Sequence, residues 1–114
     1  MRRIVLIFFV MVKVLLLTSC DTYSMEDLPD GELLYSVYSE TEEYRIDVFL
    51  CSGNATTAFS IRCAVVEVET EESRNIYWQY KEEDAVVTWI DENTVDINGV
   101  MLDIHNDSYD WREE

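Results

Sequence analysis

The sequence predicts an all-β protein: a small antiparallel meander that forms a β-sandwich or open barrel of about seven strands, preceded by an N-terminal signal helix. Short runs rich in Val, Ile, Tyr and Trp recur at roughly ten-residue spacing, and polar turns separate them. No helical period of useful length follows the first apolar run. The 114 residues suffice for one domain and leave no room for a second core.

The first element is an apolar run at residues 4–17, placed between Met1-Arg2-Arg3 and Leu17-Thr18-Ser19-Cys20. A helix of this length spans about 21 Å, which is shorter than the roughly 30 Å core of a bilayer. A basic start, a short apolar middle and small residues before a cysteine are typical of a lipoprotein signal peptide, residues 1–19. We therefore expect lipidation of Cys20, which would anchor the chain on the extracytoplasmic face of the cell membrane.

Lys13 interrupts this apolar run. A lysine at the centre of an inserted helix costs about 2.5 to 3.5 kcal/mol, although its long stem can carry the ammonium group to the headgroups. The alternative is an uncleaved signal anchor or plain secretion, in which Cys20 is an ordinary thiol.

Residues 20–32 are acidic, contain the only proline, Pro29, and show no periodicity, which predicts a tether. A single β domain at 33–114 follows. Its expected strands are 33–39, 44–51, 58–68, 75–80, 85–90, 94–97 and 100–104. The third run is irregular because apolar side chains occur on both faces, which predicts a bulge near Ala64 or burial on both sides.

The strongest local signal is Asn98-Gly99, a two-residue turn of type I′ between two short apolar runs. It sets Ile97 opposite Val100 and Val95 opposite Leu102. One buried face of this kind determines how the two strands pair.

Cys51 and Cys63 remain as a pair if Cys20 is lipidated, and a disulfide suits an exported protein. A tight hairpin at Gly53-Asn54 would nevertheless place the two cysteines far apart along the strands. Bridging requires Cα atoms within about 7 Å, hence a wider loop or a contact through another strand. A disulfide and two buried free thiols are the two alternatives.

The charge of the chain is strongly negative, at −16. Residues 1–19 hold three of the eight basic residues and none of the 24 acidic ones, so the remainder carries five against 24, a net charge of −19. This balance argues against nucleic acid as a partner and favours a cationic protein, peptide or metal ion. A merely solvated acidic surface is the simplest alternative.

No catalytic group can be singled out from the sequence, because carboxylate pairs are numerous by chance among 24 acidic residues. His105 is the only histidine and no Gly-x-Ser-x-Gly motif occurs, so we predict no enzyme activity and no catalytic residue. Asp103, Asp107 and Asp110 could gather oxygens around calcium, but their spacing is not that of an EF-hand, and we predict no metal and no cofactor. Arg62 is expected to pair with a carboxylate or stack on an aromatic ring.

Several short elements resemble one bacterial family: Gly53-Asn54-Ala55-Thr56-Thr57, Arg62, Ile76-Tyr77-Trp78, Trp89, Ile97-Asn98-Gly99-Val100, Leu102-Asp103 and Tyr109-Asp110-Trp111-Arg112. The chain is similar to the proteins catalogued as domain of unknown function 5412, which are short, largely Gram-positive and often carry an export or lipoprotein signal. Asn54 departs from the family's second glycine, although asparagine tolerates positive φ. The resemblance implies the compartment and the fold, and assigns no activity.

These observations predict a membrane-anchored lipoprotein whose β domain is a binding or interaction module. Binding would use the sheet edge or two loops, with candidate residues Gly53, Asn54, Thr56, Thr57, Asp107, Tyr109, Asp110 and Arg112. The alternative is an acidic inhibitor or immunity-type protein that captures a basic enzyme or toxin.

Overall fold

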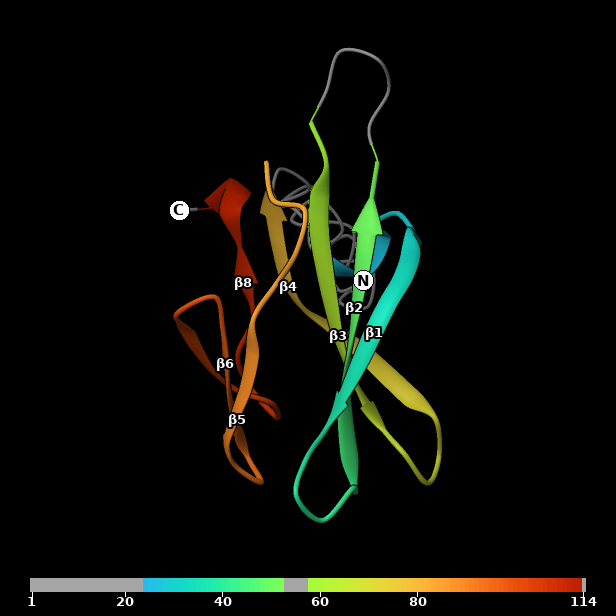
Figure 1. The fold of residues 1–114 in the computed structure, drawn as a ribbon, viewed down its shortest axis with the longest axis vertical. Helices are drawn as coiled ribbons and strands as arrows, with labels where there is room; N and C mark the ends of the chain where they lie inside the picture. Colours follow the sequence, from blue (N-terminus) through green and yellow to red (C-terminus); the bar gives the residue numbers. More distant parts are fainter. Residues whose placement is uncertain (1–23, 53–57, 114) are drawn as a thin grey trace, which may run out of the picture.

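Two β-sheets make up the protein in the computed structural model, which describes residues 24–52 and 58–113 (Figure 1). The larger sheet has the order β1-β2-β3-β4-β8, and its strands are Glu32–Tyr38, Tyr44–Cys51, Ser60–Glu67, Glu72–Tyr80 and Tyr109–Asp110. The smaller sheet has the order β5-β6-β7, with strands Val87–Asp91, Thr94–Ile97 and Val100–Asp103. Two 3-10 helices, η2 (Met25–Asp27) and η3 (Trp111–Glu113), complete the described elements.

The predicted all-β class is confirmed, and all seven expected strands are present, β2 and β6 with the expected bounds and the other five with shifted ends. The two sheets stay open and do not close into a barrel. The eighth strand, β8, was not predicted, and it pairs parallel to β4 whereas the other pairings are antiparallel. The signal helix expected at residues 1–19 and the lipidation site Cys20 lie outside the described residues.

The core lies between the two sheets, because alternate residues of each strand point inward. The larger sheet contributes Ile46, Val48, Ile61, Cys63, Val65, Ile76 and Tyr77, and the smaller sheet region contributes Ala85, Val95, Ile97, Leu102 and Ile104. Burying one large aliphatic side chain of this kind stabilises a fold by about 1.5 to 3 kcal/mol.

The turn between β6 and β7 forms as predicted. Asn98 and Gly99 have φ of 50° and 90°, and Ile97 pairs with Val100. The Asn98 side chain also reaches across to the β4–β5 connection, where its Oδ1 accepts from the Val86 N–H at 2.8 Å and its Nδ2 donates to Glu82 Oε1 at 2.9 Å. The turn residue therefore joins the two sheets.

Both explanations for the irregular third run hold. The β3–β4 pairing shifts between Cys63 and Ala64, and the additional residue, Ile76, lies on β4. Ala64 and Val66 are also buried on the outer face of the sheet, at 3% exposure each.

Cys51 and Cys63 are free thiols in the structure, and the disulfide does not form. The premise of a tight hairpin at Gly53-Asn54 is wrong, because Cys51 pairs with Ser60 and Cys63 with Val48. The wider loop does not bring the cysteines together, because Cys63 lies in the core between the sheets while Cys51 points to the opposite face.

The predicted tether is structured over the part that the structure describes. Residues 24–31, which we call the strap, cross the outer face of the larger sheet. Asn75 Nδ2 donates to the Met25 carbonyl oxygen at 2.7 Å, and Arg62 Nη2 donates to that of Asp30 at 2.6 Å. The Cys51 thiol faces the Pro29 carbonyl oxygen at 3.7 Å. The strap is therefore part of the folded domain.

Candidate functional site

An acidic hollow between two hairpin turns is the candidate site. Its volume is about 370 Å³, and it is lined by Glu42, Glu43, Tyr44, Glu67, Val68 and Glu69. The two turns touch, because the Val68 N–H donates to the Glu43 carbonyl oxygen at 3.0 Å. All four glutamates are exposed, and no basic residue lines the hollow.

The topology explains why these turns meet. Successive turns of a meander alternate between its two ends, so the β1–β2 and β3–β4 turns lie at the same end of the larger sheet (Figure 1). The β5–β6 turn of the smaller sheet lies at this end as well. Its Glu92 accepts from the Thr41 hydroxyl at 2.7 Å and from the Thr41 N–H at 3.0 Å.

Electrostatics keeps this end negative. The two hydrogen bonds from Thr41 hold the pKa of Glu92 below its usual value, so this carboxylate stays ionised. Arg45 is the nearby cation, but its guanidinium bonds Asp47 Oδ1 at 2.9 Å and Glu71 Oε1 at 3.2 Å. These two carboxylates hold the pKa of Arg45 above its ordinary value. Arg45 is thus engaged beside the hollow and does not neutralise it.

The basic residues of the described ranges are confined to the larger sheet and its flanks, whereas acidic residues occur on both sheets. The five basic residues of the described ranges lie in the larger sheet or directly after its strands: Arg45, Arg62, Arg74, Lys81 and Arg112. Residues 82–111, which include the whole smaller sheet, contain no Lys or Arg, and β5, β6, β7 and their turns carry Asp91, Glu92, Asp96 and Asp103. Within the described residues, every basic side chain therefore belongs to the larger sheet or to the segments next to its strands.

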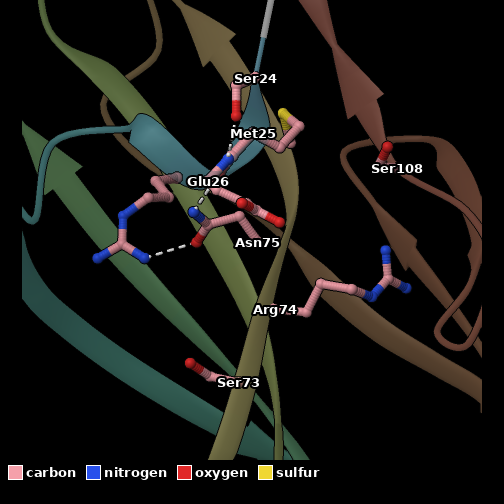
Figure 2. Close-up of a pocket in the computed structure, with 8 residues that line it drawn as sticks. Ser24, Met25, Glu26, Ser73, Arg74, Asn75 and Ser108 are labelled. Atoms are coloured by element: carbon pink, nitrogen blue, oxygen red, sulfur yellow. Dashed lines mark hydrogen bonds between the residues drawn. The ribbon is translucent and has the colours of Figure 1, made fainter. Parts of the chain in front are cut away.

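A second, larger pocket of about 710 Å³ lies between the strap, β4 and the segment before β8 (Figure 2). The two arginines that line it are engaged within the protein through their terminal nitrogens, while the buried Arg62 Nε has no hydrogen-bond partner among the described residues. Arg62 Nη1 donates to Asn75 Oδ1 at 2.7 Å, and Arg74 donates to the carbonyl oxygens of Ile104 and Asp107. These contacts hold the strap and the C-terminal segment to the sheet, so we interpret this pocket as structural.

Arg62 is stacked as expected, with its guanidinium carbon 3.9 Å from the Phe49 ring centroid. It pairs with the Asn75 side chain and the Asp30 main chain, and not with the carboxylate that was the other expectation.

The structure describes only one of the two loops predicted to bind a partner. Gly53, Asn54, Thr56 and Thr57 lie outside the described residues. Tyr109 stacks on Tyr77, with ring centroids 5.3 Å apart, and its hydroxyl donates to Gln79 Oε1 at 2.8 Å.

The other predicted binding residues of the C-terminal loop, Asp107, Asp110 and Arg112, also make contacts that stabilise the fold. Asp110 is buried and binds Arg112 Nη2 at 2.7 Å. The hydrogen bonds from Arg112 hold the pKa of Asp110 below its usual value. Asp107 Oδ2 accepts from the Asp103 N–H at 2.9 Å and shapes the turn before β8.

The sequence also predicted binding at a sheet edge. At the edge strand β1, part of the backbone is already hydrogen-bonded within the protein. The Trp89 indole N–H donates to the Val37 carbonyl oxygen at 3.0 Å, which occupies one of the acceptors that an edge strand presents. The Tyr35 hydroxyl donates to Asp84 Oδ1 at 3.0 Å and to the Ala85 carbonyl oxygen. Burial and the Asp84 carboxylate raise the pKa of Tyr35 to about 12.

The described residues present no arrangement typical of acid–base catalysis. His105 Nε2 lies 3.0 Å from Asn93 Oδ1, and the ring packs edge-on against Tyr44. Burial raises the pKa of the Cys63 thiol, which disfavours the nucleophilic thiolate. Within residues 24–52 and 58–113, no group of three or more His, Cys, Asp or Glu side chains could hold a metal ion.

The four glutamates of the hollow were not singled out from the sequence, in which Glu67 and Val68 fall within the expected strand 58–68. Their grouping could have been found, because the meander order places the first and third turns at one end. The contact between Thr41 and Glu92 could not be predicted from the order of the meander, because the two residues belong to turns of different sheets.

The structured ranges contain no helix that is both long and apolar enough to span a membrane. No curated protein and no solved structure matches the chain. A family model described as a family of unknown function, DUF5412, matches residues 1–114. Among the described elements that carry the resemblance, Asn98 bonds Val86 and Glu82, and Asp110 pairs with Arg112. The chain belongs to the DUF5412 family.

Proposed function

We propose that the protein is an extracytoplasmic lipoprotein, anchored through Cys20, whose β-sandwich domain is a binding module for a cationic protein or peptide. The observation that carries the proposal is the acidic hollow, which four exposed glutamates line and which no basic residue of the described ranges lines. The lysine or arginine of a partner could place its charged end among these carboxylates and its aliphatic stem over Tyr44 and Val68.

The surroundings of the hollow favour this use. Arg45 is engaged by Asp47 and Glu71, so it does not compete for the glutamates. Residues 20–114 carry a net charge of −19, from five basic and 24 acidic residues. This charge would also accelerate the approach of a cationic partner and slow that of an anionic one.

A charge-matched pair of variants tests the binding role. Calorimetry with a hexalysine peptide compares the wild type with E42Q/E43Q/E67Q/E69Q and with E26Q/D27N/E32Q/E83Q. Both variants lose the same charge, but the second leaves the hollow intact. We expect affinity to fall roughly tenfold in the first, since each exposed charge pair contributes about 0.2 to 1 kcal/mol, and less in the second. Equal losses would show that only diffuse charge attracts the peptide.

Salt provides the second arm of this experiment. Binding to the wild type should weaken steeply as ionic strength rises, because exposed charges are screened. Binding that persists at high salt contradicts capture by the glutamates. Loss of activity in a captured basic enzyme would identify the narrower inhibitor or immunity function.

The anchor is tested separately by mass spectrometry of the mature amino terminus. Cleavage before Cys20 with an added diacylglycerol mass is the expected result. A chain that retains Met1 contradicts the anchor.

A further inference from the structure

The strap leaves a very short connection between the proposed lipid and the folded domain. The carbonyl oxygens of Ser24 and Met25 accept from Arg112 Nη2 at 3.4 Å and from Asn75 Nδ2 at 2.7 Å. Only residues 21–23 separate Cys20 from this contact. Whatever their conformation, the four steps from Cys20 to Ser24 reach at most about 14 Å.

The strap is held along its length, so it does not readily lengthen the connection. Arg62 holds Asp30 at the far end of the strap. Gly31 has a φ of +74°, and a Cβ there would lie 2.7 Å from Cys51 Sγ and 2.8 Å from the Leu50 carbonyl oxygen. The strap thus ends in a close approach to β2 that requires glycine.

The geometry of the two sheets then restricts how the domain can sit on a membrane. The strap lies on the outer face of the larger sheet, and the smaller sheet packs on the opposite face. Packed sheets lie about 10 Å apart, and side chains extend beyond each of them. A domain resting on its smaller sheet would hold Ser24 farther from the bilayer than about 14 Å allows.

Charge favours the same orientation. The basic residues belong to the larger sheet, and the smaller sheet has acidic residues without any Lys or Arg. The strap carries Glu26, Asp27 and Asp30, but Arg62 and Arg112 contact it and partly offset these charges. Residues 82–111 contain no Lys or Arg, so we expect the smaller sheet to be repelled more strongly by anionic phospholipids.

We infer that the lipid on Cys20 holds the outer face of the larger sheet, around the strap, against the phospholipid headgroups, while the smaller sheet faces away from the membrane. This inference rests on the proposed anchor and adds the surface that meets the membrane.

Site-specific protection from a bulky, membrane-impermeant maleimide tests the orientation. The full chain is expressed in a bacterium that processes lipoproteins and reconstituted into phosphatidylcholine–phosphatidylglycerol vesicles. S73C reports on the strap face and M101C on the exposed face of the smaller sheet. Cys51 and Cys63 are buried and give little background. A control form of each variant carries about twelve additional Gly and Ser residues before Tyr23, which make the connection to the lipid long and flexible. The labelling rate of each variant is divided by the rate measured at the same site in its control form.

The expected ratio is several-fold below one at residue 73 and close to one at residue 101. Equal ratios in a chain with lipidated Cys20 overturn the orientation and leave the anchor standing. Labelling of Cys20 itself, together with failure of the chain to float with vesicles, overturns the proposed anchor and the orientation with it.

Discussion

Arg62 in the middle of β3 donates from Nη2 to the carbonyl oxygen of Asp30 at 2.6 Å, across 32 positions of the chain. The same guanidinium stacks on Phe49 and bonds Asn75, which in turn holds Met25. One side chain thus connects the strap to the outer face of the sheet. Arg62 therefore holds one end of the strap directly and supports Asn75, which holds the other end.

Replacing Arg62 should therefore release the strap. We expect R62A to lower the free energy of unfolding by about 1 to 3 kcal/mol, because it removes hydrogen bonds and leaves Asn75 incompletely paired. Urea denaturation measures the loss, and limited proteolysis should cut residues 24–31 faster. K81A is the control, because Lys81 is exposed and only approaches the Tyr80 ring at 5.8 Å. Similar losses in both variants would contradict the role of Arg62.

Asp110 gives a prediction with a defined pH dependence. Its pKa is lower in the folded state, chiefly because Arg112 donates to the carboxylate. Its stabilising effect is therefore complete above the ordinary aspartate pKa of about 3.9 and disappears as the pH falls through the lowered folded-state value. D110N should destabilise the protein by about 1.5 to 3 kcal/mol at pH 7, and the difference from wild type should vanish in acid. A difference independent of pH would count against the ion pair.

Asn98 combines a backbone requirement with side-chain contacts. N98A should lose both the tolerance of φ at 50° and the bonds to Val86 and Glu82. We expect a destabilisation of about 2 to 4 kcal/mol, from about 1 kcal/mol of backbone strain and the lost hydrogen bonds. N98G keeps the backbone freedom and should lose less. Thermal unfolding of the two variants compares the contributions, and equal stabilities would show that the conformation of the turn contributes nothing.

Glu42 is strained in the folded state, because its φ is 65°. E42N should raise the free energy of unfolding by up to about 1 kcal/mol, since asparagine adopts this conformation more readily. The same change removes one carboxylate of the hollow, so hexalysine affinity should fall while stability rises. Chemical denaturation and calorimetry on the same sample measure both. Stability gained without any loss of affinity would separate Glu42 from the binding site.

Sequence patterns predicted the parts of the fold that depend on neighbouring residues. The turn at Asn98-Gly99 and the pairing of Ile97 with Val100 were correct because two residues of turn chemistry and one apolar face determine them. The strap was not predicted because the contacts that hold it use backbone carbonyl oxygens. Every residue type has this group, so the sequence gives no signal for such contacts. Strand β8 was missed because two residues, Tyr109 and Asp110, give no periodicity.

The candidate site was accessible only in part. The polar turns between the expected strands were recognised, but the way two of them meet depends on long-range contacts. Thr41 and Glu92 are 51 positions apart, and no local pattern joins them. Cys51 and Cys63 illustrate the same limit, because the sequence left open the length of the loop that sets their pairing partners.

The most direct test of the binding site is an NMR titration of the isotopically labelled protein with hexalysine at low salt. The account predicts that the largest amide shifts occur at Glu42, Glu43, Glu67 and Glu69 and that added salt reverses them. Shifts of similar size over all acidic residues, or shifts concentrated away from the hollow, would contradict it.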